Sequence, residues 1–265
     1  MPLILDDIRK DRESVPITSD FPAAPRQTSV PGFEEACRHY PITDFPLFCN
    51  AYAELCRVDL TGKTAVELAC GRGDLAVCLA KKFPGGRIVA VDRYPESGAA
   101  IREAQARGEV PNLEYHCGDA QDLTFLGEES VDLVFGQAAL HHLANDVLTL
   151  SLQTGRVIKP GGRLLFLFEP LGHNWLVSCV RAIQVARHEM ADESNLFLSS
   201  FREIGRTFDR VHVQSFNLTG YFLKGIPSTL AAPLARLANR LDRTIAAILP
   251  NATKFGANAN IVFYK

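Results

Sequence analysis

Residues 64–76 (T-A-V-E-L-A-C-G-R-G-D-L-A) constrain the fold more than any other part of the chain. The first residues are mostly small or apolar, as in a strand buried within a parallel sheet. Gly71 and Gly73 then allow a tight turn and close approach of a ligand to the backbone. Asp74 is placed to cap the helix that follows. Strand, glycine turn and helix in this order predict the nucleotide-binding unit that opens a doubly wound α/β domain.

The charges around this turn indicate which nucleotide it holds. The spacing Gly71-x-Gly73-x-x-Ala76 satisfies a loose dinucleotide fingerprint, so an NAD-dependent oxidoreductase is one interpretation. However, Glu67 and Asp74 place negative charge on both sides of the turn. These carboxylates would repel a diphosphate and attract an ammonium or sulfonium group. S-adenosylmethionine carries both cations and no phosphate, so the charges favour it over NAD.

The length and composition restrict the class of protein. A chain of 265 residues suits one α/β domain with additional cover. Lys+Arg 28 against Asp+Glu 30 gives no broad nucleic-acid footprint. The cysteines, 7 in all, show no paired C-x-x-C spacing, which predicts a reduced, cytoplasmic protein without a structural metal. We see no signal-peptide pattern and no bilayer-spanning apolar stretch, so stable membrane insertion is not expected.

Two further strands are predicted to end in carboxylates. Residues 87–92 (R-I-V-A-V-D) end in Asp92, which at the carboxyl edge of a parallel sheet can accept both ribose hydroxyls. The alternative role for Asp92 is a cap. Residues 113–117 form the next predicted strand and precede G-D-A. There Asp119 can accept the exocyclic amine of an adenine, and the backbone of Ala120 can donate to the ring.

A fourth predicted strand, 131–135, delivers two adjacent imidazoles, His141 and His142, to the same edge. Histidine titrates near neutrality, so either is a candidate for proton transfer. Adjacent helical residues point about 100° apart, so only one can readily face a ligand. The alternative is that one histidine packs or caps and neither transfers a proton. Glu169, after a fifth strand at 163–168, is a second candidate base or substrate anchor, or it holds the following turn.

Five motifs occur in order along the chain: E-L-A-C-G-R-G, V-A-V-D, G-D-A, D-L-V-F-x-x-A-A-L-H-H-L and I-K-P-G-G. Together they resemble the class I S-adenosylmethionine-dependent methyltransferases, of the small-molecule type grouped with the ubiquinone/menaquinone methyltransferases. The resemblance covers residues 55–170, and residues 259–264 resemble the closing strand of the family. It implies a doubly wound, mostly parallel seven-stranded sheet whose last strand is antiparallel.

The resemblance implies a site for S-adenosyl-L-methionine formed by residues that follow successive strands: Glu67, Ala69, Cys70, Gly71, Gly73, Asp92, Arg93, Asp119, Ala120 and Gln137. It assigns the methionine end to Glu67 and the glycine loop, and the ribose to Asp92. It further assigns the adenine to Asp119 with Ala120, and contact with the amino-acid moiety to Gln137.

Two residues depart from the family pattern. Ala69 stands where the family usually has its first loop glycine, and we expect the site to tolerate the methyl group. Arg93 stands where an apolar residue often packs on the adenine, and its aliphatic stem can still cover the ring.

The remaining segments are expected to cover the site. Residues 1–46 are polar and proline-punctuated and predict an N-terminal arm and cap. Residues 47–265 form the predicted methyltransferase domain, with helical insertions at about 171–207 and 219–256 over the substrate.

The second insertion carries an apolar helical stripe: Leu230, Leu234, Leu237, Leu241, Ile245 and Ile248. Three arginines flank it: Arg236, Arg240 and Arg243. Such a helix usually packs against its own domain, and Pro233 with the short apolar arc favours a packing or lid helix here. The alternative is a helix that lies on a membrane surface.

The sequence therefore predicts methyl transfer from S-adenosylmethionine to an O, N or C atom of a small metabolite in secondary or cofactor metabolism. An in-line displacement of this kind needs mainly alignment and a dry pocket. If the acceptor must be deprotonated, His141 or His142 is the first candidate base and Glu169 the second. A non-methylating protein on the same scaffold, with a cyclase or binding role, is the remaining alternative.

Overall fold

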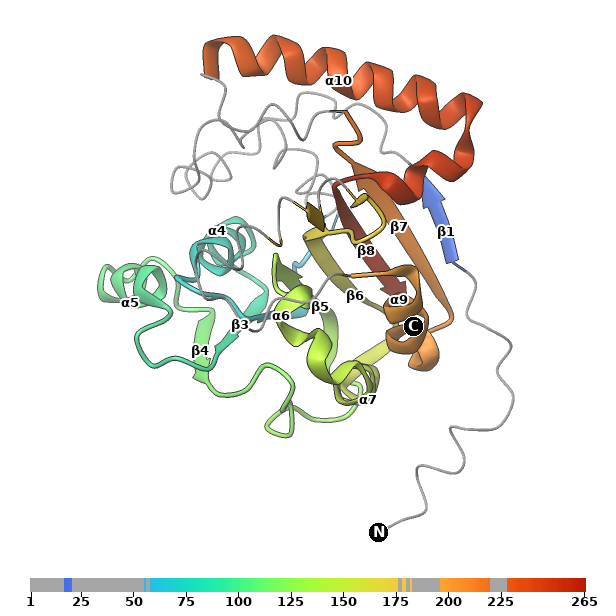
Figure 1. Cartoon of the computed structure of the whole chain (residues 1–265). Helices are drawn as coiled ribbons and strands as arrows, with labels where there is room; N and C mark the ends of the chain where they lie inside the picture. Colours follow the sequence, from blue (N-terminus) through green and yellow to red (C-terminus); the bar gives the residue numbers. More distant parts are fainter. Residues whose placement is uncertain are drawn as a thin grey trace.

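The computed structural model describes residues 17–20, 55, 58–175, 178–179, 182, 196–219 and 228–265. Most of the predicted arm at 1–46 and parts of both predicted insertions lie outside these residues. Figure 1 shows a central twisted sheet with helices on both faces and one long helix beyond its upper edge.

Within the described residues, a single 8-stranded sheet has the order β1-β7-β8-β6-β5-β2-β3-β4. The strands are β1 (Ile17–Asp20), β2 (Thr64–Leu68), β3 (Arg87–Asp92), β4 (Leu113–Cys117), β5 (Val131–Gln137), β6 (Ile158–Pro170), β7 (Arg210–Phe216) and β8 (Asn258–Tyr264). All neighbours pair in parallel except β8, which is antiparallel to both β6 and β7. The predicted doubly wound, mostly parallel sheet with an antiparallel last strand is confirmed.

The first strand corrects one expectation. Residues 17–20 were predicted to belong to a polar arm, yet they form β1, which adds an eighth strand at the edge of the predicted seven. Ile17 pairs with Val211 and Asp20 with Gln214 in a parallel ladder. The pairing joins segments almost two hundred residues apart, and four residues of I-T-S-D carry too little alternation to predict it.

Helices cover both faces of the sheet (Figure 1). They are α4 (Asp74–Lys82), α5 (Ala99–Ala106), α6 (Leu140–Leu143), α7 (Val147–Val157), α9 (Leu198–Ile204) and α10 (Ser228–Ile248), with the 3₁₀ turns η2 (Ala144–Asp146), η3 (Gly205–Thr207) and η5 (Pro250–Phe255). No described helix combines the length and apolarity that a membrane crossing requires.

Two apolar clusters fill the spaces between the sheet and its helices. Alternate residues of β5 point to opposite clusters: Leu133 and Phe135 pack with α4 and α5, whereas Val134 packs with α7 and α9. This alternation is what burial on both faces of a parallel sheet demands. The core therefore fixes the strand ends on which the candidate site residues lie.

The long helix α10 lies beyond the edge where β1 and β7 end (Figure 1). Its buried face is formed by Ala238 and Asp242, and the Asp242 carboxylate accepts the backbone N–H groups of Leu218 and Thr219, both at 2.9 Å. The hydroxyl of Thr219 also donates to Asp242 at 2.7 Å. These bonds tie α10 to the chain that leaves β7.

The apolar stripe of α10 is not packed as predicted. Leu234, Leu237, Leu241 and Ile248 are exposed, with 41%, 53%, 47% and 72% of their surface accessible. Because neighbouring helical residues point about 100° apart, docking α10 through Asp242 turns the side chain of Leu241 away from the sheet. The sequence identified the stripe but not the face that docks.

Replacing Asp242 with alanine should lower the free energy of unfolding by about 2 kcal/mol, because two backbone N–H groups would lose their acceptor. Denaturant unfolding followed by circular dichroism measures this change. Asp209→Ala, at an exposed aspartate, is the control and should change stability by less than about 0.5 kcal/mol. Equal losses in both variants would contradict the anchoring role of Asp242.

Candidate functional site

The turn between β2 and α4 places backbone N–H groups at the carboxyl edge of the sheet. Gly73 is the N-cap of α4, with φ of 82°, and no side chain caps the helix. A Cβ at Gly73 would overlap the side chain of Ile101, so both backbone conformation and space require glycine. The predicted cap, Asp74, is instead the first residue of the helix, where its charge still favours the N-terminus.

Glu67 lies beneath this turn and is 3% exposed. The backbone N–H of Ala76 donates to its carboxylate, but Oε2 has no hydrogen-bond partner among the described residues. Burial raises the pKa of Glu67 to about 8, and repulsion from Asp74 and Asp92 adds to the shift. A buried acidic group of this kind is satisfied best by a cationic N–H donor.

Asp92 connects the end of β3 to the same turn. Its Oδ2 accepts the N–H of Gly71 at 2.8 Å, and its Oδ1 accepts the N–H of Tyr94 at 3.2 Å. Each carboxylate oxygen has two acceptor positions, so both oxygens keep one for a further donor. This geometry fits the predicted contact with two ribose hydroxyls.

The predicted adenine end is more open. Asp119 is exposed, and its Oδ1 accepts the N–H of Gln121 at 2.9 Å, while Ala120 is buried. Arg93 is exposed, and its guanidinium lies 5.9 Å from the centroid of the Tyr94 ring. The Arg93 guanidinium therefore lies near an aromatic residue next to the predicted ribose position.

His141 and Glu169 form a buried pair on α6 and β6. The His141 Nδ1 lies 2.8 Å from the Glu169 Oε2, and the two side chains are 8% and 0% exposed. Glu169 Oε1 also accepts the N–H groups of Ala139 and Leu140 at 2.7 Å and 2.8 Å. The carboxylate is therefore placed to accept a proton from Nδ1, and Nε2 is the ring nitrogen that does not face Glu169.

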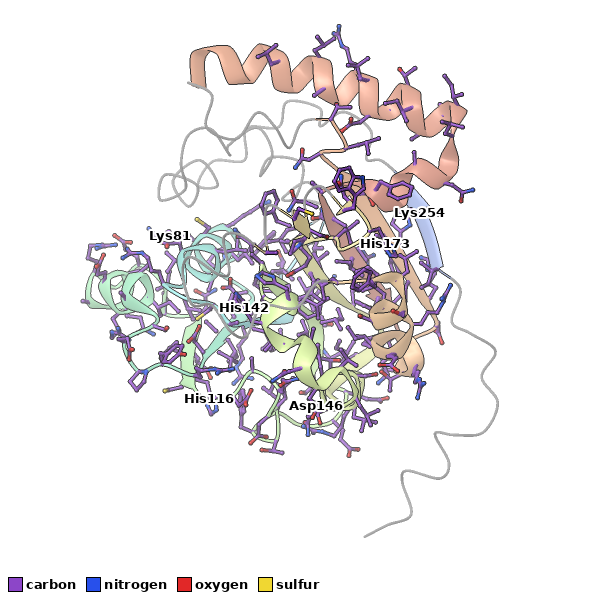
Figure 2. The ribbon with its side chains drawn as sticks, in the orientation of Figure 1. Lys81, His116, His142, Asp146, His173 and Lys254 are labelled. Atoms are coloured by element: carbon purple, nitrogen blue, oxygen red, sulfur yellow. The ribbon has the colours of Figure 1, made fainter. Side chains whose placement is uncertain are left out.

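The structure thus gives the three predicted acid–base residues different environments. Glu169 is placed behind His141 and occupied by donors, which suits a positioning group better than a base that meets substrate. His142 is exposed, and its ring centroid lies 4.1 Å from that of His141 (Figure 2). The two imidazoles lie close together but differ in burial, since His141 is buried.

A β-bulge in β6 aims Glu169 at α6. Phe166 pairs with Ile261 and Glu169 with Ala259, so two residues of β6 oppose the one residue between them on β8. Phe168 in this bulge has φ of 58°, and its N–H donates to Asn260 Oδ1 at 3.2 Å. Bulges of this kind redirect side chains next to functional sites.

A family model described as a methyltransferase domain matches residues 65–162. Residues 65–162 are therefore similar to a methyltransferase domain. The match contains the glycine turn and the ends of β2, β3, β4 and β5, on which the candidate cofactor residues lie. Methyltransferase domains of this kind use S-adenosylmethionine as the methyl donor, in agreement with the predicted cofactor.

Curated relatives match the methyltransferase domain over part of their length. The probable phthiotriol/phenolphthiotriol dimycocerosates methyltransferase 2 of Mycobacterium ulcerans is 32% identical over 132 residues, 46% of this chain and 49% of the relative. The demethylmenaquinone methyltransferase of Lactococcus lactis is 34% identical over 109 residues, 40% of this chain and 42% of the relative. The chain therefore aligns with less than half the length of either relative.

A solved structure shows the same fold. The YcgJ protein of Bacillus subtilis superposes with a TM-score of 0.54 at 18% identity, covering 80% of this chain and 95% of that chain. At this identity the likeness supports the fold of the methyltransferase domain and nothing finer.

The sequence reasoning missed a strip of buried asparagines at the same edge. Asn258 and Asn260 alternate with Ala259 along β8, and Asn217 Nδ2 donates to Asn258 Oδ1 at 3.2 Å. The Oδ1 of Asn217 is buried with no partner among the described residues. The sequence signal that could have identified this strip is N-A-N at the start of a strongly apolar strand. Asparagine is unfavourable in a buried strand unless a hydrogen bond compensates.

The asparagine strip faces the same way as Glu67. Glu67 pairs with Phe135, Phe135 with Leu165, and Leu165 with Val262. Residues paired across a sheet share a face, and Asn260, two residues from Val262, shares it as well. Polar groups from both halves of the methyltransferase domain therefore point to one side of the carboxyl edge.

Backbone strain gathers at this edge. Ala69, Ala138 and Phe168 adopt positive φ values of 50°, 48° and 58° at the ends of three adjacent strands. Non-glycine residues in this region cost free energy and gather at functional sites. Among the described residues, no group of three or more His, Cys, Asp or Glu side chains is placed to hold a metal ion.

Replacing Ala69 with glycine should raise the free energy of unfolding by about 0.5 kcal/mol. Alanine at a positive φ costs conformational energy in the folded state, and glycine removes that cost. This gain in free energy exceeds the loss that results from the greater conformational entropy of glycine in the unfolded chain. Ala65→Gly, in the regular part of β2, is the matched control and should destabilise by about 1 kcal/mol. Thermal unfolding of the two variants checks the opposite signs, and destabilisation by both would contradict the strain at Ala69.

Proposed function

We propose that the chain transfers the methyl group of S-adenosylmethionine to a small metabolite at the carboxyl edge of the sheet. The observation that carries this proposal is the buried Glu67 carboxylate, whose Oε2 lacks a partner and whose pKa is raised to about 8. Its destabilised charge would be relieved by a cation, and Asp74 and Asp92 make the same site unfavourable for a diphosphate.

The remaining candidate residues fit the rest of the cofactor. Asp92 would accept the ribose hydroxyls with the two acceptor positions left by Gly71 and Tyr94. Asp119 and the backbone of Ala120 would contact the adenine, and Gln137 the amino-acid moiety. Ala69, Cys70, Gly71 and Gly73 would line the methionine end, and the stem of Arg93 would cover the adenine.

The chemistry needs alignment and, for some acceptors, a base. Bound S-adenosylmethionine supplies an electrophilic methyl group on its sulfonium. Transfer would require the nucleophilic atom of the acceptor to lie in line with the bond between the methyl carbon and sulfur, so the residues of the site would mainly fix this alignment. His141 Nε2 would accept the proton that the acceptor loses, and Glu169 would stabilise the imidazolium through Nδ1.

The acceptor is proposed to reach this edge beneath the cover formed by residues 1–46 and the insertions at 171–207 and 219–256. The asparagine strip supports an acceptor with a neutral hydrogen-bonding group, because the buried Asn217 Oδ1 requires an N–H or O–H donor. The named acceptors of the relatives, a phthiotriol dimycocerosate and demethylmenaquinone, support a small molecule without fixing the acceptor atom.

Two measurements test the proposed function. Calorimetry with S-adenosylmethionine and with NADH should show binding of the first only. Incubation with methyl-labelled S-adenosylmethionine and a metabolite extract should then give a labelled small molecule. Binding of NADH alone would contradict the cofactor, and tight cofactor binding without a labelled product would favour the non-methylating alternative.

A further inference from the structure

One face of α10 is apolar but is not packed into the core of the domain. The four exposed apolar residues, Leu234, Leu237, Leu241 and Ile248, fall within an arc of about 60° on a helical projection. Figure 2 shows the described side chains of α10 projecting from a helix that stands clear of the sheet. A single exposed leucine is common on protein surfaces, whereas a continuous apolar stripe of four residues indicates a contact surface.

The exposed charge on α10 is positive, and its negative charge is buried. Arg240 is exposed and Arg243 is half-buried. The helix has a single acidic residue, Asp242, which is 2% exposed and bonded to Leu218 and Thr219. The charge that the described face of α10 offers to a partner is therefore basic.

Aromatic residues lie close to the C-terminal end of the helix. Trp175 is 73% exposed and Phe255, on η5 directly after α10, is 41% exposed. The Asn174 amide donates to the backbone O of Phe255 at 2.8 Å, which joins the two segments. Lys254 extends from the same turn (Figure 2). Tryptophan and basic residues beside an apolar strip are typical of membrane interfaces.

We propose that α10 docks the protein on the surface of an anionic membrane. The stripe Leu234, Leu237, Leu241 and Ile248 enters the boundary between headgroups and acyl chains, and the exposed Arg240 beside the stripe contacts lipid phosphates. The helix lies on the bilayer and does not cross it.

A lipid surface fits α10 better than a second copy of the chain. Two copies packed through this stripe would bring their arginines together, and neither α10 has an exposed acidic residue to offset the repulsion. Anionic headgroups supply the missing negative charge, at about fivefold in affinity for each arginine near the surface. None of the candidate cofactor residues lies on α10, so vesicle binding and cofactor binding can be measured separately.

Sedimentation with sucrose-loaded vesicles tests the proposal on the full chain. Vesicles of equal parts phosphatidylcholine and phosphatidylglycerol should bind the protein, and pure phosphatidylcholine should bind it more weakly. Leu241→Glu should reduce binding by about tenfold or more, and Arg240→Gln by about fivefold. Leu148→Glu on α7, at a leucine of similar exposure (42% against 47% for Leu241), is the matched control and should bind like the wild type.

Each result decides the proposal. Salt-sensitive binding that is lost in Leu241→Glu and retained in Leu148→Glu supports it, provided that both variants melt like the wild type. Absence of wild-type binding to the mixed vesicles, or equal losses in the two leucine variants, would overturn it. Light scattering that shows a dimer converted to a monomer by Leu241→Glu, without vesicle binding, would assign the stripe to self-association instead.

Discussion

Replacing Glu67 with glutamine is expected to weaken the binding of S-adenosylmethionine by roughly 100-fold. The variant keeps the size of the side chain and removes the negative charge that faces the predicted position of the methionine end. Removing one partner of a buried charge pair costs about 3 kcal/mol, which corresponds to this factor in Kd. Titration calorimetry measures the loss, and Glu103→Gln on the exposed face of α5 is the matched control that should bind normally.

The same substitution is expected to change how stability depends on pH. The folded protein holds a proton on Glu67 up to about pH 8, whereas the unfolded chain loses it near the ordinary value of 4.5. Between these values the native state binds more protons, so this group makes the free energy of unfolding fall as pH rises. The slope for one group is at most about 1.4 kcal/mol per pH unit. Glu67→Gln should lack this component.

Affinity and stability should therefore respond in opposite directions to pH. Cofactor binding by the wild type should weaken below about pH 8, because the protonated carboxyl no longer attracts a cation. In Glu67→Gln this part of the pH dependence should disappear. Denaturant unfolding and calorimetry across the same pH range check both effects, and unchanged cofactor affinity in a folded Glu67→Gln variant would overturn the proposed site.

Replacing His141 with asparagine is expected to have the second large effect, on kcat. For an acceptor that must lose a proton, we expect kcat to fall by about 10²- to 10⁴-fold, with little change in cofactor affinity. The asparagine amide can still donate to Glu169 in place of Nδ1, while the acceptor nitrogen Nε2 is gone. Steady-state kinetics with the labelled methyl donor measures the change, and the limb of the pH profile that reports the base should be lost.

Two further variants identify which group moves the proton. Glu169→Gln should lower kcat by changing the tautomer of His141, and it should also reduce stability, because Glu169 accepts the N–H groups at the start of α6. If His142→Asn reduced kcat while His141→Asn did not, the base would be His142. Full activity in all three variants would mean that the acceptor is already nucleophilic and that both histidines are structural.

Much of the predicted cofactor site could be identified from the sequence because its determinants are local. The acid–glycine turn after β2 needs only the conformations of Gly71 and Gly73 and the small residues of one strand. Asp92 and Asp119 could be added because parallel strands bring their carboxyl ends to one edge whatever else the chain does. The location of these residues at that edge agrees with the prediction.

The acid–base residues were harder to predict. The sequence placed His141, His142 and Glu169 at one edge but left three roles open for the glutamate: a base, a substrate anchor or a residue that holds the following turn. The bulge at Phe168 changes the direction of the side chain that follows, and it depends on Asn260, which lies far along the chain in β8. A long-range contact of this kind leaves no local pattern, so the buried His141–Glu169 pair could not be foreseen.

The sequence by itself determined the doubly wound sheet and the preference for a cationic cofactor, because these follow from local conformation and from charges carried on a fixed topology. The methyltransferase class followed from the resemblance of five motifs to that family. Only the tertiary structure decided that residues 17–20 join the sheet, that Glu169 lies behind His141 and that the stripe of α10 faces outward. Each of these depends on a partner distant in the chain. The apolar periodicity of α10 predicted that the leucine stripe would face the domain. The hydrogen bonds of Asp242 to Leu218 and Thr219 instead turn the Asp242 side of the helix toward the domain.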